Sequence, residues 1–306
     1  MSIALQILGC NSAAFAHGRH QTSQVLKIQD QYVLIDCGEG TQLQMRKHQV
    51  KISKINIIVI SHLHGDHYYG LIGLLSTLHL FGRKKDLVLI GPPGLSDVIC
   101  LQLKYSETSL NFKINFTEWT PGEERLVLDH PKFTITTIPL DHRVPCAGYL
   151  FQEKPKKRRI DKLKLPVKLP PSEIYKLKCG EDLVDEKGNV LHKNEDVTLP
   201  PLRTLSYAFC SDTRYNPELK TNLQDVDLLY HEATFTSEME QRAKNTYHST
   251  ARQAATLAKD SGVGRLLIGH FSTRYRNLEP VLEEALEVFE KTEIAAEGHI
   301  FEVDEY

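Results

Sequence analysis

Short apolar runs separated by turn residues recur along both halves of the chain and predict a protein rich in β-strands. Residues 55–60 read INIIVI, a β-branched and almost continuously apolar run that is typical of a strand covered on both faces. Residues 133–140 instead alternate between apolar and polar side chains, which also indicates a strand. We expect strands over residues 4–8, 25–28, 32–36, 57–60, 87–90, 111–116, 133–140, 148–152, 206–210, 228–232, 266–269 and 299–303.

Helices are expected between these strands. Residues 94–105 and 280–291 carry apolar side chains at spacings of three and four, which indicates helices with one face against a core. A helix over residues 68–81 should follow the strand at 57–60. Four alanines give the helix expected over 249–260 a narrow packing face.

The composition limits what kind of protein this is. The chain has 306 residues, of which 41% are hydrophobic, so it can bury a large core. Its formal net charge is −2, which excludes a protein that binds polyanions through an overall excess of positive charge. Any surface that binds nucleic acid must therefore come from a local cluster of positive side chains. The 6 cysteines form no CxxC pair, which favours free thiols in a reducing cytoplasm. The sequence has no signal peptide pattern and no apolar span of membrane length, so we expect a soluble, cytoplasmic protein without a membrane partner.

The most informative segment follows the strand expected at 57–60 and reads SHLHGDH over residues 61–67. Alternate side chains of an extended segment share a face, so His62 and His64 can bind one ion. Gly65 turns the chain, and Asp66 and His67 then begin the next helix, directed at a second ion. Such mixed donors suit Zn²⁺ best, with Mn²⁺ and Fe²⁺ as alternatives. The spacing therefore predicts a dinuclear metal site, and it disfavours the alternative of a histidine-rich loop without metal.

The order His-x-His-x-Asp-His resembles the signature of the metallo-β-lactamase superfamily. This resemblance implies an α+β fold, the αββα sandwich of that superfamily. Further donors that such a fold requires, His142, Asp212 and His270, follow three later apolar runs. One ion would take His62, His64 and His142, the other would take Asp66, His67 and His270, and Asp212 would be shared. This set leaves open positions for water, as in a catalytic rather than a structural site.

Two further motifs narrow the resemblance. Residues 230–234 (YHEAT) and 247–250 (YHST) resemble the paired His-Glu-Ala-Thr and His-Ser-Thr motifs of ribonuclease Z, the endonuclease that matures transfer RNA 3′ ends. Residues 7–10 and 34–41 resemble the N-terminal strands and following loop of that family. A polar insertion lies where the family carries its substrate-binding arm. The resemblance divides the chain into the first half of a core (1–151), an inserted basic flexible arm (152–201) and the second half of the core (202–306).

The first part of the insertion is strongly basic. Its cations lack the apolar periodicity that would bury them, and they are Lys154, Lys156, Lys157, Arg158, Arg159, Lys162, Lys164 and Lys168. Phosphate is the natural partner, because such contacts add affinity without regard to sequence. A solvated basic loop is the alternative. Arg274, just past His270, is a further candidate for a phosphate contact, with a surface salt bridge as its alternative.

The resemblance implies a zinc-dependent endoribonuclease with two Zn²⁺ per subunit that cleaves the 3′ trailer from precursor transfer RNA. Attack by a metal-activated water would leave a 3′-hydroxyl on the transfer RNA and a 5′-phosphate on the trailer. Asp66 would act as general base, His248 as general acid, and Glu232 would orient His248 or a ligand histidine. Relatives of this length work as pairs of subunits, so a homodimer is expected by resemblance. DNA is not an expected partner.

Two segments depart from the family pattern. Residues 169–175 read LPPSEIY and place Ser-Glu where relatives have a Gly-Pro step. Residues 15–20 read FAHGRH and keep only Arg19 of a Pro-x-Lys-x-Arg-Asn loop, which leaves open how precursors with an encoded CCA are treated.

Two other classes of protein also stay open on the sequence alone. One is a metallohydrolase of a small phosphodiester, thioester or lactam, and the other is a non-catalytic RNA-binding module, which the intact ligand set disfavours.

Overall fold

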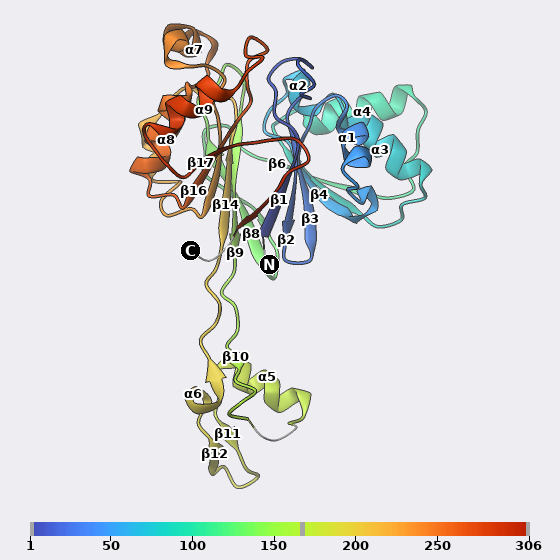
Figure 1. Cartoon of the computed structure of the whole chain (residues 1–306). Helices are drawn as coiled ribbons and strands as arrows, with labels where there is room; N and C mark the ends of the chain where they lie inside the picture. Colours follow the sequence, from blue (N-terminus) through green and yellow to red (C-terminus); the bar gives the residue numbers. More distant parts are fainter. Residues whose placement is uncertain (1–2, 166–168, 304–306) are drawn as a thin grey trace. The chain divides into compact units, whose positions relative to one another are not determined.

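Within residues 3–165 and 169–303, which the computed structural model describes, two seven-stranded sheets form the larger of two units (Figure 1). The first sheet runs in the order β18 (Ile300–Val303), β1 (Ile3–Gly9), β2 (Ser23–Ile28), β3 (Gln31–Cys37), β4 (Ile55–Val59), β5 (Leu87–Gly91) and β6 (Ile114–Glu118). The second runs in the order β17 (Thr292–Ile294), β16 (Arg265–Gly269), β15 (Leu228–Glu232), β14 (Ser206–Cys210), β9 (Ala147–Glu153), β8 (Phe133–Pro139) and β7 (Leu126–Asp129). Lys168 lies outside the described residues.

The two sheets share one apolar core. Leu5 and Ile35 of the first sheet belong to the same buried cluster as Tyr149 and Phe209 of the second. A further cluster packs the opposite face of the first sheet against three helices, α1 (Thr41–Lys47), α3 (Leu71–Leu80) and α4 (Leu95–Tyr105). On the second sheet lie α8 (Ala251–Asp260) and α9 (Glu279–Leu286) (Figure 1). The layers follow the order helix, sheet, sheet, helix, which confirms the αββα sandwich.

All of the expected strands are present, although their ends shift, as at β6, which begins at Ile114 rather than at residue 111. Two strands of the sandwich were not expected, β7 and β17. Both are short and both lie at the edge of the second sheet. Their residues are only partly buried, so they lack the apolar run that marks a central strand. Their pairing depends on the neighbouring strand rather than on a local pattern.

The helix expected over residues 68–81 is present as α3 but begins later, at Leu71, after the separate short helix α2 (Gly65–Tyr68). Gly70 lies at the break, where its N–H donates to the carbonyl of Cys37 at 2.9 Å. A Cβ at Gly70 would lie 2.3 Å from the carbonyl oxygen of Gly38. The loop after β3 therefore lies against the backbone of Gly70, and α2 becomes a separate turn that carries Asp66 and His67.

The helix expected over 249–260 begins later, at Ala251. Thr250 caps this helix with two hydrogen bonds. Its side chain accepts from the N–H of Gln253, and the Gln253 side chain accepts from the N–H of Thr250. The helix expected over 280–291 is shorter than predicted and ends at Leu286. The remaining short helical segments of the larger unit are 3₁₀ turns at Ile52–Lys54, Pro217–Lys220 and Ser237–Met239, and α7 (Glu240–Thr246).

Residues 153–204 form the second unit, which we call the arm. It contains two small strand pairs, β10 (Arg159–Ile160) with β13 (Thr198–Leu199) and β11 (Leu183–Val184) with β12 (Val190–His192). Its helices are α5 (Pro171–Cys179) and α6 (Asn194–Val197). Leu177, Leu183 and Val197 make a small buried core of its own, which the sequence analysis did not anticipate.

No disulfide joins the 6 cysteines, all of which lie among the described residues, as expected. Across the part of the chain that the structure describes, no helix is both long enough and apolar enough to cross a membrane.

Replacing Gly70 with alanine tests the close contact at the α2–α3 break. The added methyl group would overlap the Gly38 carbonyl, so we expect the free energy of unfolding to fall by about 1–3 kcal/mol, measured by urea denaturation. Gly73→Ala in α3 is the matched control, because its methyl group would meet only the end of the Gln42 side chain, and alanine favours a helix. Equal stability of the two variants would show that the contact is not restrictive.

Candidate metal centre

Four strands of the two sheets end near one another on polar residues. The groups that they carry are His62 and His64 after β4, Asp66 and His67 on α2, His142 after β8, Asp212 after β14 and His270 after β16. Their ligand atoms form overlapping clusters in which all members lie within 4.8 Å of one another. The structure therefore brings together all seven side chains that the sequence analysis selected as ligands.

The first cluster consists of three imidazoles and one carboxylate oxygen. His142 Nε2 lies 3.2 Å from His64 Nδ1. Asp212 Oδ2 lies 3.7 Å from His62 Nε2 and 3.8 Å from His142 Nε2. These four residues form one of the groups that could hold an ion.

The second cluster uses the other oxygen of Asp212. Its Oδ1 lies 3.2 Å from His67 Nε2 and 3.1 Å from His270 Nε2. The two imidazole nitrogens are 3.3 Å apart. Asp66 Oδ2 completes the cluster at 3.5 Å from His67 Nε2 and 3.7 Å from His270 Nε2. Asp212 thus presents one oxygen to each cluster, an arrangement in which one carboxylate can be shared by two ions.

The donor set fits divalent metal ions. Ligand atoms about 2.0–2.1 Å from a tetrahedral ion are separated by roughly 3.3 Å, which is close to the distances in both clusters. In addition, His62 Nε2 is buried and has no hydrogen-bond partner among the described residues. An unpaired buried nitrogen is costly unless something else engages it, and an ion in the first cluster would do so.

Hydrogen bonds on the outer side of the imidazoles direct their free nitrogens toward the centre. His67 Nδ1 donates to Asp36 Oδ2 at 2.6 Å, and the same carboxylate accepts from the N–H of Ser61 at 2.7 Å. His142 Nδ1 donates to the carbonyl of Tyr247 at 3.1 Å. In these histidines Nε2 therefore carries the lone pair that a metal requires.

Three residues at the site hold a backbone conformation that side chains other than glycine rarely adopt. The φ angles are 55° at Asp36, 58° at Asp212 and 58° at His270. Each lies at or just after the end of a strand. Such a conformation costs on the order of 1–3 kcal/mol, so it persists only where the surrounding structure imposes it.

The buried Glu232 and the partly buried His248 form a pair beside the second cluster. His248 Nδ1 donates to Glu232 Oε1 at 2.9 Å, and the N–H groups of Thr213 and Ser249 also donate to this carboxylate, at 2.7 and 3.0 Å. Burial lowers the pKa of His248, but the Glu232 carboxylate outweighs it and raises the pKa to about 9. Burial likewise raises the pKa of Glu232, and the imidazolium lowers it overall. His248 is thus held as a cation, which does not bind metal, although it lies close enough to Asp212 and His270 to complete a third cluster.

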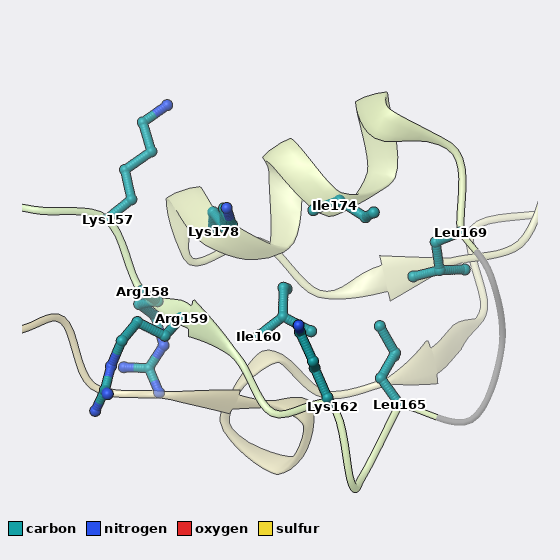
Figure 2. Close-up of a pocket in the computed structure, with 9 residues that line it drawn as sticks. All are labelled: Lys157, Arg158, Arg159, Ile160, Lys162, Leu165, Leu169, Ile174 and Lys178. Carbon is teal, nitrogen blue, oxygen red and sulfur yellow. The ribbon is translucent and has the colours of Figure 1, made fainter.

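Four of the cations in the arm contact other groups of the arm. Lys156 Nζ lies 2.6 Å from the buried carboxylate of Glu153, and Lys157 Nζ lies 3.3 Å from the centre of the Tyr175 ring. Arg158 Nε donates to Thr198 Oγ1, and Arg159 Nε donates to the carbonyl of Pro200. The arm also has a cavity of about 740 Å³. Its lining, drawn in Figure 2, combines cations with apolar side chains and consists of Lys157, Arg158, Arg159, Ile160, Lys162, Leu165, Leu169, Ile174 and Lys178.

Lys154 and Arg274 are the two other residues that the sequence analysis selected for phosphate contacts. Lys154 is half-buried within the arm. Arg274 is exposed, just past His270.

The sequence analysis missed two residues that orient ligands. Asp36 was a visible candidate, because a carboxylate near the end of an otherwise apolar run is unusual. Thr234 had a weaker signal. Its hydroxyl donates to Glu232 Oε2 at 2.5 Å and accepts from His270 Nδ1 at 2.9 Å, so it links the two buried groups.

Comparison with known proteins places the chain among relatives of matching length. It is 48% identical over 305 residues to ribonuclease Z of Cytophaga hutchinsonii, covering 100% of this chain and 97% of that protein. It is 42% identical over 303 residues to ribonuclease Z of Bacteroides thetaiotaomicron, covering 99% and 96%. A family model described as anti-Pycsar protein Apyc1 matches residues 3–154.

Two solved structures are similar to this chain over nearly its whole length. The crystal structure of the short form of human tRNase Z superposes with a TM-score of 0.73 at 26% identity, covering 98% of this chain and 99% of that one. The metallo-β-lactamase fold protein YhfI from Bacillus subtilis superposes with a TM-score of 0.69 at 18% identity, covering 99% and 100%, which concerns the fold alone.

An Asp36→Asn variant tests whether the outer carboxylate orients His67. The amide can donate to Nδ1 and so favour the wrong tautomer, and we expect zinc affinity to fall by about 10–100-fold, measured by competition with a chromophoric chelator. Asp30→Asn, which alters an exposed carboxylate paired with Lys132, should keep the affinity of the unmodified chain. Unchanged affinity in Asp36→Asn would contradict the orienting role.

Proposed function

This chain belongs to the ribonuclease Z family, and on that premise we propose that it is an endoribonuclease that cleaves the 3′ trailer from precursor transfer RNA. Ribonuclease Z relatives align with it over its full length, and human tRNase Z shares its fold. The observation that carries the activity is the carboxylate of Asp212 between two clusters of imidazoles, with the His248–Glu232 pair beside them. Paired metal sites of this kind are common in phosphodiester hydrolases.

We assign two Zn²⁺ to the clusters, because imidazole nitrogens together with carboxylate oxygens suit this ion. His62, His64 and His142 would hold one ion and Asp66, His67 and His270 the other, with Asp212 between them. When bound, the ions would lower the pKa of a water that serves as nucleophile and would withdraw charge from the non-bridging phosphate oxygens.

Asp66 is suited to accept the proton of the attacking water. Its Oδ2 is fixed by the N–H of Ala13 at 2.8 Å, and its side chain remains 13% exposed at the site. A carboxylate held in this way needs no reorientation during the reaction.

His248 is suited to protonate the leaving oxygen. Glu232 holds its Nδ1 and keeps the ring protonated, which leaves the Nε2 proton available for transfer. Protonation of the O3′ atom yields a transfer RNA with a 3′-hydroxyl and a trailer with a 5′-phosphate.

The basic arm supports a polyanionic substrate. We propose phosphate contacts from Lys154, Lys156, Lys157, Arg158 and Arg159 of the arm and from Arg274 of the larger unit. Lys157 and Arg159 have the strongest case, because both are exposed, whereas the charge of Lys156 is already paired with Glu153. We expect no DNA substrate, and the free thiols suit a cytoplasmic protein.

We also propose that the chain forms a homodimer. Large apolar side chains are exposed on adjacent helices, with Leu43 of α1 70% exposed, Leu80 of α3 79% and Phe81 just after α3 77%. Thr77 of α3 donates to Gln42 of α1 at 2.6 Å, so the two helices present one continuous surface. A cavity of about 640 Å³ with Leu43 and Phe81 in its lining lies there. Exposed apolar surface of this kind marks an interface.

Mapping both product ends tests the proposed activity. Zinc-loaded protein incubated with a 3′-extended transfer RNA should release a trailer that accepts a 5′ label only after phosphatase treatment, and a transfer RNA that ends in a 3′-hydroxyl. We expect His248→Ala to lower kcat by about 10²–10⁴-fold at unchanged zinc content, because proton transfer to O3′ is lost.

His130→Ala, which alters a histidine in the turn between β7 and β8, is the matched control and should retain the kcat of the unmodified chain. Turnover of a small diester such as bis(p-nitrophenyl) phosphate as efficient as that of the transfer RNA would instead favour a small-molecule hydrolase. Full activity of His248→Ala would rule out its role as the acid.

The double substitution Leu43→Glu with Phe81→Glu tests the dimer. Charges buried at an apolar interface are strongly unfavourable, so sedimentation velocity should show a dimer for the unmodified chain and a monomer for the variant. Leu163→Glu, at a side chain of the arm that is 96% exposed, should leave the dimer intact. A monomer for the unmodified chain would refute the proposal.

A further inference from the structure

A second cavity adjoins the metal centre. Its volume is about 250 Å³, and it is lined by Arg214, Tyr215, Glu240, Lys244, His248 and Gln253. His248 also lines the cavity that contains the metal ligands. The proposed acid therefore lies between the reacting centre and a pocket that contributes nothing to the ligand set.

Arg214 is held in one orientation at this pocket. Its guanidinium carbon lies 3.5 Å from the centre of the Tyr247 ring. Its Nε donates to the carbonyl of Lys244 at 3.0 Å, and its Nη1 lies 3.7 Å from Asp141 Oδ2. A planar guanidinium fixed on one face by an aromatic ring is prepared to stack against a nucleobase on the other.

Tyr247 connects this arginine to the metal centre. Its φ of 61° lies in the left-handed region, which is costly for a tyrosine. That conformation accompanies two contacts, because the Tyr247 carbonyl accepts from His142 Nδ1 while the ring supports Arg214. The same residue thus orients a ligand histidine and a basic group of the adjoining pocket.

The lining of the pocket itself is basic. Arg214 and Lys244 outnumber the one carboxylate of the lining, Glu240, whose Oε1 accepts from Gln253 Nε2 at 3.2 Å. Asp141, outside the lining, balances the charge of Arg214 but leaves that of Lys244 available. The ammonium group of Lys244 is exposed and suits a phosphate. A volume of 250 Å³ corresponds to about eight water molecules, which suits a single nucleotide rather than several stacked bases.

The stereochemistry of the proposed cleavage indicates which nucleotide this is. In an in-line displacement the attacking and leaving oxygens lie on opposite sides of phosphorus. A P–O bond forms to the water as the P–O3′ bond breaks, one water proton passes to Asp66 and the proton of His248 passes to O3′. The ribose that carries O3′ must therefore lie at His248, next to the second cavity.

We propose that this cavity binds the last nucleotide that the transfer RNA retains, with its base stacked on Arg214 and its own 5′-phosphate at Lys244. The proposal rests on the proposed function, because it requires O3′ to leave beside His248. Arg214 would then be a positioning residue that places the scissile bond, and Lys244 would contribute a charge contact.

The test compares an intact precursor transfer RNA with one that lacks only the base of the last retained nucleotide. For the unmodified protein, loss of one stacked base should lower kcat/KM by about 10–100-fold. Arg214→Lys keeps the charge but removes the planar group, so the ratio of kcat/KM on the two substrates should fall toward one. Arg252→Lys, at an exposed arginine paired with Glu287, should keep the ratio of the unmodified protein.

Lys244→Ala gives a second and independent signature. The abasic substrate retains its phosphate, so this variant should lose kcat/KM to a similar extent on both substrates, and its salt dependence should weaken by about one phosphate contact. An Arg214→Lys variant that retains the full ratio would overturn the proposal, as would a Lys244→Ala variant without effect. If the unmodified protein cleaves no precursor at all, the proposed function itself is wrong, which is a distinct result.

Discussion

The carboxylate of Asp212 is the contact on which the site depends. It presents Oδ1 to His67 and His270 and Oδ2 to His62 and His142. Asp212 follows β14 of the second sheet, whereas His62 and His67 follow β4 of the first. The site therefore exists only while the two sheets keep their positions relative to each other. The apolar core that the sheets share maintains those positions.

Each sheet also supplies a buried carboxylate that acts through a histidine. Asp36 of the first sheet binds His67 Nδ1, and Glu232 of the second binds His248 Nδ1. The two partners have different consequences. His67 directs Nε2 at Asp212 and His270, inside the second cluster, while His248 directs its ring at the edge of the clusters, with its pKa raised by Glu232 to about 9. The same chemical pairing thus produces a ligand in one place and an acid in another.

The sequence predicted most of the sandwich, because long apolar runs mark central strands. It also selected seven donors that the structure brings together, because donors that follow such runs lie at strand ends. It did not predict features that depend on distant contacts. The break at Gly70 is imposed by the loop after β3, and the edge strands β7 and β17 depend on their neighbours. Two further contacts likewise join residues that are far apart in the chain. They are the hydrogen bond between Asp36 and His67 and the stacking of Arg214 on the Tyr247 ring. The small core of the arm has too few apolar residues to give a periodic pattern.

X-ray absorption spectroscopy of the zinc-loaded protein tests the shared carboxylate most directly. We expect two zinc ions per chain, nitrogen and oxygen ligands at about 2.0–2.1 Å, and a second zinc about 3.5–4 Å away. Asp212→Ala should abolish the zinc–zinc signal. A single zinc with no metal neighbour, or a sulfur ligand at about 2.3 Å, would contradict a paired centre built on Asp212.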